Sequence, residues 1–409
     1  MIRKYVVPGR VELAGKHVDY GGGRSLTCAV RFAMRAAAKP IDARVLRVRQ
    51  RGSPDVVSVP LSPDAAPSRI RWSTYVAAVA RRVARDFGEA VQRGVEVRLT
   101  SGIPPASGLS SSTALTMALL RSVVDATGVA DDPRFIEYAG TPLSFAEYAA
   151  AVETGSAHGP FLADGGVGVR GGAQDHVAIA CAREGMVGRF SYIPAREEGW
   201  APWPADRVLA IAVSAVRATK TGNARHAYNR ASDAVRWLVG AWNAATARSD
   251  PTLAAALASS ADAHDRLGRI AAGAEGAPVP AAYLARRLAQ FREECYLIVP
   301  GIEGALRAGD LACVGTLVDR SQALAEHALE NQVPETIHLA RSARELGADA
   351  ASAFGAGFGG AVWAMVQCGD AGDFLARWHE SYAAAFPARA ARSRFMQTTP
   401  GAAMHEAPG

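Results

Sequence analysis

The sequence predicts a two-domain α+β protein, and this prediction rests on the length of the chain and on two patterns along it. At 409 residues the chain exceeds the usual size of one domain, about 150 residues. Residues 44–61 and 94–99 alternate between apolar and polar side chains, as strands do. Residues 253–345 are almost entirely helical in composition, with breaks expected near 273–279 and 298–301. We therefore expect a mixed sheet with helices in the N-terminal domain, and a helix-rich C-terminal domain with its own antiparallel sheet.

A change of pattern near residues 196–204, REEGWAPWP, suggests where the two domains meet. Proline, glycine and tryptophan interrupt the regular pattern there. Residues 208–216, VLAIAVSAV, then read as an apolar strand that leads toward a long helix. The expected domains are therefore residues 1–204 and 205–409.

The composition is that of an ordinary globular protein, with 49% apolar and 21% charged residues. No run of about 18 apolar residues occurs, so we expect no membrane span. The first residues, MIRKYVVPGRVEL, lack the apolar core of a signal peptide, which predicts a cytoplasmic protein. The five cysteines are scattered without C-x-x-C spacing, which argues against a disulfide framework or a zinc site.

The formal net charge is +6, and only four of the 45 basic residues are lysines. No run of basic residues interleaved with aromatic residues occurs, so we expect no nucleic-acid partner. A small anionic ligand fits the modest positive charge better.

Residues 101–120, SGIPPASGLSSSTALTMALL, predict a strand end, a loop rich in glycine and serine, and a helix. Pro104 and Pro105 exclude a regular helix before the loop, and Gly108 supplies backbone freedom. Unpaired N–H groups and the positive end of the dipole at a helix N-terminus attract phosphate. The stretch therefore indicates either a nucleotide phosphate site or a serine-rich helix cap.

Residues 7–31 combine an apolar strand, a polar cluster and three successive glycines, followed by a second apolar stretch. Four polar side chains of different chemistry on one loop favour a site held by the flanking strands, while the alternative is a hairpin with a solvated tip. These four residues are Arg10, Lys16, His17 and Asp19.

Two further glycine-rich segments follow. A helix expected over residues 145–152 has Glu153 near its end, and the glycine-dense residues 154–175 then end at the carboxylate of Asp175. The apolar run HVAIAC after Asp175 is predicted to be a strand. Residues 353–365, AFGAGFGGAVWAM, indicate a second glycine loop before an apolar strand, or a tight turn between helix and strand.

Three separated motifs together resemble the GHMP small-molecule kinases, and among them the galactokinases. They are PGRVELAGKHVDY at residues 8–20, the pattern P-x-x-x-G-L-S-S-S at 104–112 and the pattern G-x-G-x-G-G at 355–360. The resemblance implies a two-domain GHMP-kinase-like fold with the active site in the interdomain cleft. It also implies ATP-dependent phosphorylation of the anomeric hydroxyl of a monosaccharide, with galactose as the first choice.

The resemblance also implies roles for individual residues. Asp175 would orient or deprotonate the anomeric hydroxyl, and Arg10 would stabilise the developing charge. His17, Asp19, Tyr228 and the backbone of Gly172 would bind the sugar. Ser112, alone or with Ser111, and Glu153 would hold Mg²⁺, which prefers one or two protein oxygens beside phosphate and water. The residues expected around ATP are Pro104, Ser107, Gly108, Leu109, Ser110, Ser111, Ser112, Gly355, Gly357, Gly359 and Gly360.

The chain departs from the galactokinase pattern G-R-x-N-x-x-G-E-H-x-D-Y at Glu12, which replaces an asparagine, and at Lys16, which replaces a glutamate. A lysine cannot accept a hydroxyl proton, so Lys16 could instead pair with the carboxylate of a sugar such as galacturonate. Alternatively, Glu12 and Lys16 satisfy each other and leave the sugar pocket nearly intact. L-arabinose is a further candidate substrate, and a non-catalytic regulator that binds sugar and ATP is the candidate of another class.

Two other departures concern the nucleotide side of the site. Glu153 and Asp175 are separated by 21 residues, which is longer than the usual spacing in the family. Ala353 and Phe354 replace the basic and hydroxyl residues that often precede the glycines of the third motif.

Overall fold

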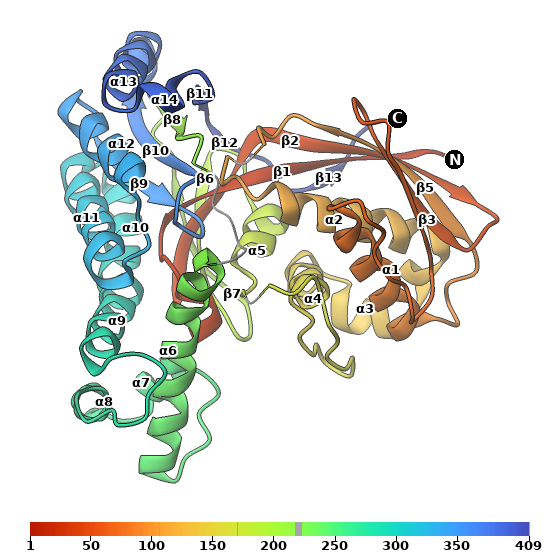
Figure 1. The fold of residues 1–409 in the computed structure, drawn as a ribbon, viewed down its shortest axis with the longest axis horizontal. Helices are drawn as coiled ribbons and strands as arrows, with labels where there is room; N and C mark the ends of the chain where they lie inside the picture. The colour runs from red at the N-terminus through yellow and green to blue at the C-terminus, as the bar shows by residue number, and fades with distance from the viewer. Residues whose placement is uncertain (106, 170, 217–222, 409) are drawn as a thin grey trace.

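The computed structural model describes residues 1–105, 107–169, 171–216 and 223–408, and side chains are described for all of these except 223–228. Within this part of the chain the strands form a nine-stranded sheet and a four-stranded sheet. The nine-stranded sheet and its helices make one end of the molecule, and a column of helices beside the four-stranded sheet makes the other (Figure 1). Mixed sheet in the first half and a helix-rich second half confirm the predicted α+β fold.

The large sheet has the order β13-β1-β2-β5-β3-β4, and β12 and β6 also pair with β2. The expected antiparallel pairing within residues 44–61 is confirmed, because β3 and β4 form a hairpin. The long strands β1 and β2 run side by side from the N-terminal helices toward the second half (Figure 1). The strands are β1 (Arg3–Ala14), β2 (Arg24–Ile41), β3 (Val45–Gln50), β4 (Val56–Pro60), β5 (Gly94–Ser101), β6 (Met186–Ser191), β7 (Arg196–Pro202), β12 (Pro400–Gly401) and β13 (His405–Glu406).

The segment expected to interrupt the pattern at residues 196–204 contains strand β7, which pairs with β6. Its glycine and tryptophan are accommodated within the hairpin, because Trp200 packs edge-on against Phe190 at a ring distance of 5.5 Å. At the other end of the chain β12 and β13 return to the first sheet, so that both termini lie side by side (Figure 1).

Helices cover the large sheet on the side where α1, α2 and α4 pack together. The prediction of a strand for HVAIAC is wrong, since these residues lie in helix α5. The run is apolar at nearly every position and buried on nearly all sides, so it carries no period that would separate helix from strand. The helical segments here are α1 (Ser73–Phe87), α2 (Ser111–Thr127), α3 (Pro133–Ala139), α4 (Pro142–Thr154) and α5 (Gln174–Cys181), with 3₁₀ turns at Asp19–Gly21 and Val129–Asp131.

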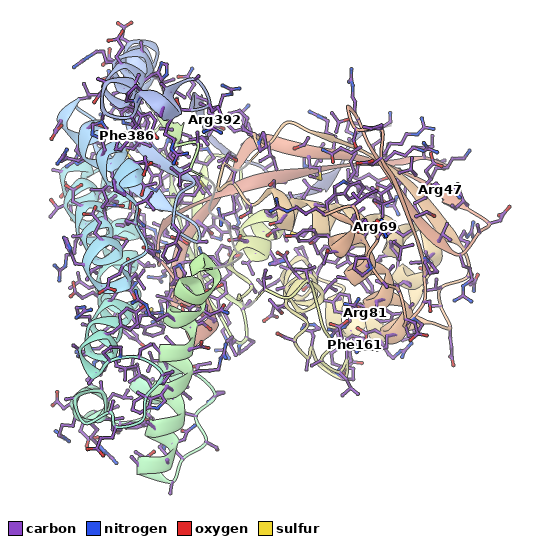
Figure 2. The ribbon with its side chains drawn as sticks, viewed as in Figure 1. Arg47, Arg69, Arg81, Phe161, Phe386 and Arg392 are labelled. Atoms are coloured by element: carbon purple, nitrogen blue, oxygen red, sulfur yellow. The ribbon has the colours of Figure 1, made fainter. Side chains whose placement is uncertain are left out.

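The small sheet is antiparallel throughout and has the order β11-β8-β10-β9, as expected for the second half. Helices α12 and α13 pack against it, and Trp378 of α13 is fully buried there. Apolar side chains fill the space between this sheet and its helices, and Phe386, labelled in Figure 2, packs partly buried against them. The elements are β8 (Arg207–Val213), β9 (Ala350–Phe354), β10 (Ala361–Gln367), β11 (Arg394–Thr398), α13 (Ala371–Ala385), α14 (Pro387–Ala390) and a 3₁₀ turn at Cys368–Asp370.

The helical column contains the expected break near residues 273–279, between α8 and α9. The second expected break, at 298–301, is wrong. A π-helical turn joins α9 directly to α10, and Pro300 directly follows this wider turn without ending the helix. The column comprises α6 (Asn223–Thr246), α7 (Leu253–Ala258), α8 (Ala263–Ala272), α9 (Ala281–Glu293), the π-helical turn Glu294–Ile298, α10 (Val299–Ala308), α11 (Leu311–Leu324), the π-helical turn Ala325–Leu329 and α12 (Pro334–Glu345).

Two sequence-based exclusions can be compared with the structure. None of the described helices combines the length and apolarity that a membrane crossing needs. All five cysteines are free thiols, which agrees with the argument from their spacing against a disulfide framework.

Candidate active site

Arg10 and Asp175, the two residues predicted to be catalytic, form an ion pair. Strand β1 carries Arg10 and the first turn of α5 carries Asp175, and Arg10 Nε lies 2.7 Å from Asp175 Oδ1. Arg10 Nη1 also donates to the carbonyl of Gly108 at 2.7 Å. Burial alone would lower the pKa of Arg10, but the charges of Asp175 and Glu12 outweigh it and raise that pKa. The Asp175 side chain keeps 30% of its surface exposed, whereas that of Arg10 keeps 5%, so the carboxylate is the accessible member of the pair.

The serine loop, residues 104–112 without residue 106, meets this ion pair. Ser110 occupies the N-cap position of α2 with a left-handed backbone (φ 58°), and its side chain makes no capping hydrogen bond within the described residues. Instead, Ser110 Oγ donates to Asp175 Oδ2 at 2.5 Å. The geometry therefore disfavours the simple cap as the role of Ser110. It leaves the first N–H groups of α2 without a side-chain cap, as a phosphate site requires.

The glycine loop, residues 355–360, connects β9 to β10 and lies against the serine loop. A side chain added at Gly355 would come within 3.5 Å of both Arg10 Nη2 and the carbonyl of Gly108. One added at Gly360 would come within 3.9 Å of the Gly108 Cα atom. The two loops thus come together beside Arg10 although they are far apart in the sequence.

Backbone conformation explains why this loop is rich in glycine. All four of its glycines have positive φ, in the region that side chains disfavour. A Cβ atom at Gly357 would lie 2.4 Å from the Asn331 carbonyl, and one at Gly359 would lie 2.6 Å from the Val216 carbonyl. These positions therefore accept glycine only.

The loop of residues 15–23 supplies His17 and Asp19, and it is called the sugar loop after the role that the resemblance predicts for them. His17 Nε2 lies 3.1 Å from the Ala356 carbonyl of the glycine loop. Burial and the nearby charge of Asp175 raise the pKa of Asp19, against hydrogen bonds from backbone N–H groups. A Cβ atom at Gly172 would lie only 2.3 Å from Asp19 Oδ2, so Asp19 depends on a glycine at this position. The structure therefore brings Asp19 and Gly172 together, as the resemblance implies for a sugar site.

Lys16 is only 1% exposed and is paired inside the protein. Its Nζ donates to Ser321 Oγ at 2.8 Å, and Ser321 Oγ donates to Glu294 Oε1 at 2.7 Å. Glu12, the other departure from the pattern, accepts a hydrogen bond from Gln174. Burial raises the pKa of Glu12 to about 8 although Lys16 and Arg10 oppose this shift. Lys16 is thus satisfied internally, and its hydrogen bond goes to α11 and not to Glu12.

The long spacing between Glu153 and Asp175 is taken up by a loop that returns to its starting point. Val167 N donates to the Glu153 carbonyl at 2.9 Å, and Asp164 N donates to the Gly155 carbonyl at 2.8 Å. The intervening residues 155–166 therefore leave and rejoin the chain at the end of α4. This closure lets the chain reach Asp175 despite the extra residues.

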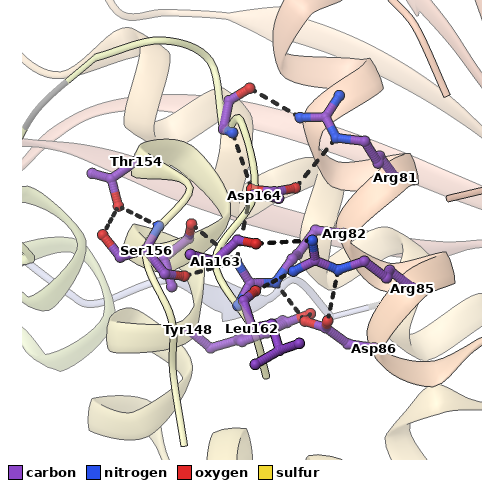
Figure 3. A network of polar contacts seen from close by, with 12 residues as sticks. Arg81, Arg82, Arg85, Asp86, Tyr148, Thr154, Ser156, Leu162, Ala163 and Asp164 are labelled. Atoms are coloured by element: carbon purple, nitrogen blue, oxygen red, sulfur yellow. Dashed lines mark hydrogen bonds and ion pairs between the residues drawn. The ribbon is translucent and has the colours of Figure 1, made fainter. Parts of the chain in front are cut away.

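Arginines of α1 fasten this loop (Figure 3). Arg82, fully buried, donates to the Ser156 carbonyl at 2.8 Å and to Asp86 Oδ2 at 2.5 Å. Arg81 binds Asp164 at 3.2 Å, and on the same side of the molecule Phe161 of the loop packs into an aromatic cluster (Figure 2). The loop is therefore an ordered part of the fold.

Glu153 is connected to Asp175 and to Ser112 through the side chains of His176 and Tyr75. His176, next to Asp175, lies 3.1 Å from Glu153 Oε2 through its Nε2 atom. Tyr75 is hydrogen-bonded to Ser112, and the charge of Glu153 helps to raise the pKa of Tyr75, after burial as the larger cause. Among the described residues, no group of three or more acidic, histidine or cysteine side chains is arranged so that it could hold a metal ion by itself. One carboxylate and one hydroxyl nevertheless suit Mg²⁺, which takes most of its ligands from phosphate and water.

Several residues at the site were not predicted from the sequence. Gln174 and His176 flank Asp175, and this adjacency is a signal that could have identified them. Glu294 and Ser321 come from a region that reads only as helix, so no local signal points to them. The predicted sugar ligand Tyr228 lies outside the residues whose side chains the structure describes.

Comparison with protein families gives three matches. Residues 4–40 match the galactokinase galactose-binding signature, residues 74–164 the N-terminal domain of GHMP kinases, and residues 302–384 the C-terminal domain of GHMP kinases. Among curated proteins, the galactokinase of Actinobacillus pleuropneumoniae serotype 5b is 33% identical over 112 residues, which are 27% of this chain and 29% of the relative. The galactokinase of Lacticaseibacillus casei is 27% identical over 184 residues, 44% of this chain and 42% of the relative. The matched regions thus span less than half of these relatives.

Solved structures resemble the chain over nearly its full length. The Lactococcus lactis galactokinase complexed with galactose has a TM-score of 0.79 at 20% identity, covering 99% of this chain and 95% of the other. The Methanococcus jannaschii mevalonate kinase has a TM-score of 0.56 at 12% identity, covering 98% of both chains. These likenesses establish the fold. The three family matches lie in the same order as the motifs, and they identify in this chain both domains of the GHMP kinases and the galactose-binding signature of the galactokinases.

Proposed function

We propose that this protein is an ATP-dependent sugar kinase that phosphorylates the anomeric hydroxyl of galactose. The observation that carries the proposal is the Arg10–Asp175 ion pair, with its accessible carboxylate beside the serine loop and beside Asp19 of the sugar loop. The galactose-binding signature over residues 4–40 supports galactose as the sugar. The related Lactococcus lactis galactokinase was solved with galactose, which supports the same choice.

The chemistry follows from the two catalytic side chains. The anomeric oxygen attacks the γ-phosphorus of ATP, and a new O–P bond forms as the bond to the bridging oxygen breaks. The electron pair of that bond leaves with ADP. Asp175 accepts the hydrogen bond of the attacking hydroxyl and orients it, and the proton passes to Asp175 or to solvent. Arg10 holds Asp175 in place and stabilises negative charge that develops nearby.

The serine loop and the glycine loop are the proposed nucleotide site. N–H groups at the start of α2 and in the glycine loop would bind phosphate oxygens, because the helix dipole and the lack of side chains favour close approach. Ser112 and Glu153 are the proposed Mg²⁺ ligands. Mg²⁺, when bound with ATP, would neutralise charge on the phosphates. His176 would hold Glu153 in position through the 3.1 Å contact.

The sugar loop favours a neutral sugar over a carboxylated one. Asp19 can accept hydrogen bonds from two neighbouring hydroxyls, while His17 and the backbone of Gly172 line the same region. Lys16 is buried and already donates a hydrogen bond to Ser321. To pair with the C6 carboxylate of a sugar, Lys16 would have to give up this hydrogen bond. Galactose is therefore proposed ahead of galacturonate, and L-arabinose, which lacks the C6 group, remains the in-class alternative.

Further predictions accompany this function. We propose residues 1–204 and 205–409 as the two domains, with the active site between them. We also propose a cytoplasmic location. Tyr228 remains a proposed sugar ligand. A catalytically silent regulator that binds sugar and ATP is the competing function, and the intact Arg10–Asp175 pair speaks against it.

A sugar panel with purified protein, Mg-ATP and a coupled assay for ADP tests the proposal. We expect ADP release with galactose, and weaker or no release with galacturonate. Binding of galactose without ADP release on any sugar would instead support the regulator. A galacturonate preference that Lys16→Glu reverses would overturn the internal pairing of Lys16 as the explanation of specificity.

A further inference from the structure

We propose that Arg287, Gln290 and Glu294, three fully buried side chains of α9 and the following π-helical turn, are positioning residues that set the affinity for the sugar. They contact no reacting atom in this proposal and act by holding the sugar loop, residues 15–23. The inference rests on the proposed function, because it assigns these residues to the sugar and not to the nucleotide.

The three side chains bind backbone groups of three successive residues. Glu294 Oε2 accepts a hydrogen bond from the N–H of Gly15 at 2.8 Å. Gln290 Nε2 donates to the carbonyl of Lys16 at 2.9 Å. Arg287 donates to the carbonyl of His17. A helix thus provides the polar partners that a strand neighbour would otherwise provide for this part of the chain.

The spacing of the three residues explains how one helix can do this. Positions three and four apart lie on the same helix face, and the sequence separations here are three and four. All three residues have no exposed surface. A buried polar face is costly unless its groups are paired, and most of these groups are paired with the loop and with one another, because Arg287 also donates to Gln290. Among the described residues, Arg287 Nε alone of this face has no hydrogen-bond partner.

The loop has a backbone that needs such support. Gly15 has φ 90°, and His17 has φ 57° although it carries a side chain. A residue other than glycine is disfavoured in this region and persists there when its surroundings hold it. The hydrogen bonds from Glu294, Gln290 and Arg287 act on the peptides at and between these two residues.

Close packing adds a second, independent contact between the same two segments. A Cβ atom at Gly21 would lie 2.7 Å from the Phe291 ring, and one at Gly23 would lie 2.6 Å from Cys295 Sγ. Arg287 also lies over the ring of Tyr20 and donates to its hydroxyl at 3.2 Å. The run of glycines therefore lets the sugar loop lie directly on the helix, with Asp19 between the two contact regions.

The serine loop lies between different elements, β5 and α2. Loosening the sugar loop should therefore change the KM for galactose much more than the KM for ATP. Gln290→Leu removes the bond to Lys16 and the acceptor for Arg287 with little change in volume. We expect the KM for galactose to rise about tenfold or more, because two buried polar groups lose their partner. The KM for ATP should change less than about twofold.

A conservative series and a surface control complete the experiment. Glu294→Ala should raise the galactose KM, and Glu294→Gln should restore much of the affinity because its side-chain oxygen can still accept from Gly15. Arg292→Ala, exposed on the same helix, should leave both KM values unchanged. If Gln290→Leu does not fold, Glu294→Ala compared with Glu294→Gln decides the question by the same KM split.

The outcomes separate this inference from the proposed function. A wild-type protein that releases no ADP with any sugar refutes the proposed function, and calorimetric galactose binding to the same variants then tests the inference alone. Unchanged galactose affinity in folded Gln290→Leu or folded Glu294→Ala overturns the inference. So does an equal rise in the KM of galactose and ATP, since that would indicate general loss of structure.

Discussion

The hydroxyl of Ser110 and the carboxylate of Asp175 lie 2.5 Å apart, with Ser110 Oγ donating to Oδ2 while Arg10 binds Oδ1. The N-cap residue of α2, the helix proposed to bind the phosphates, is thereby joined directly to the proposed catalytic carboxylate. Both oxygens of Asp175 have a defined partner, so the carboxylate has a fixed orientation before any substrate binds. This arrangement links the placement of the phosphate to that of the attacking hydroxyl.

Ser110→Ala should lower kcat by about tenfold to a hundredfold, because a hydrogen bond to a charged group is lost and the carboxylate can turn. Steady-state kinetics with galactose would measure this. Ser58→Ala, exposed on β4, is the matched control and should be neutral. A kcat of Ser110→Ala equal to that of the wild type would mean that the contact with Asp175 has no part in turnover.

Asp175→Asn should lower kcat by about a hundredfold to ten-thousandfold, the range expected when a group that orients or accepts the reacting proton is lost. Galactose should still bind, because the sugar loop is unaffected. Stopped-time assays combined with calorimetry would separate the two effects. Glu184→Gln, whose side chain is exposed in an ion pair with Arg31, serves as the control for loss of a carboxylate. Near-normal turnover of Asp175→Asn would refute its catalytic assignment.

Gly172→Ala should raise the galactose KM about tenfold or more, because its Cβ atom would lie 2.3 Å from Asp19 Oδ2 and must displace that carboxylate. The KM for ATP should stay close to that of the wild type. Gly165→Ala in the neighbouring loop is the control, since its Cβ atom would meet only Arg81 Nη2, at 4.0 Å. Equal behaviour of the two variants would show that Asp19 does not need the space beside Gly172.

Glu12 should make the stability of the protein depend on pH. Burial raises its pKa from 4.5 to about 8, so between these values the folded protein holds a proton that the unfolded chain has lost. The contribution of Glu12 to the free energy of unfolding therefore falls as pH rises through this window. Glu12→Gln removes the effect, so its stability relative to the wild type should improve from pH 5 to pH 8, by on the order of 2 kcal/mol or more.

Urea unfolding at several pH values would measure that difference. Glu380→Gln, at an exposed position of α13, should show a difference from the wild type that does not vary with pH in this way. A constant difference between Glu12→Gln and the wild type would contradict the shifted pKa.

Arg82→Met should destabilise the fold by about 3–5 kcal/mol, because it removes the buried charge partner of Asp86, which keeps only the longer 3.6 Å ion pair with Arg85, and frees the Ser156 carbonyl (Figure 3). Chemical denaturation would measure the loss. Arg341→Met, at an exposed ion pair with Glu345, should change stability by less than about 1 kcal/mol. Similar losses for both variants would show that the buried network does not anchor the loop of residues 155–166.

The fold class and much of the site could be predicted because their signals are local. Alternation indicated the strands β3 and β4, and the pattern of residues 101–120 indicated the start of helix α2. The sequence motifs named both Arg10 and Asp175, which the structure brings to 2.7 Å. Short runs without a period were the weak point, as the helix α5 shows, because a fully buried helix and a buried strand have the same composition.

Contacts between distant parts of the chain could not be predicted in this way. Lys16 and Ser321 are 305 positions apart, and nothing near either residue indicates the other. The closure of residues 155–166 depends on arginines of α1, which the sequence around the loop does not reveal. The number of residues between Glu153 and Asp175 therefore did not indicate how far apart the two residues lie in space. Glycines such as Gly172 could be named from the motif, but the close approach to Asp19 that explains them is a property of the fold.

The product of the reaction tests the central claim most directly. Wild-type protein incubated with galactose and Mg-ATP would be followed by phosphorus NMR, with coupling to the anomeric proton used to locate the phosphate. The account predicts ADP and galactose phosphorylated on its anomeric oxygen in equal amounts, and almost none of either with Asp175→Asn. Unchanged ATP in the presence of bound galactose, or a phosphate on another hydroxyl, would contradict it.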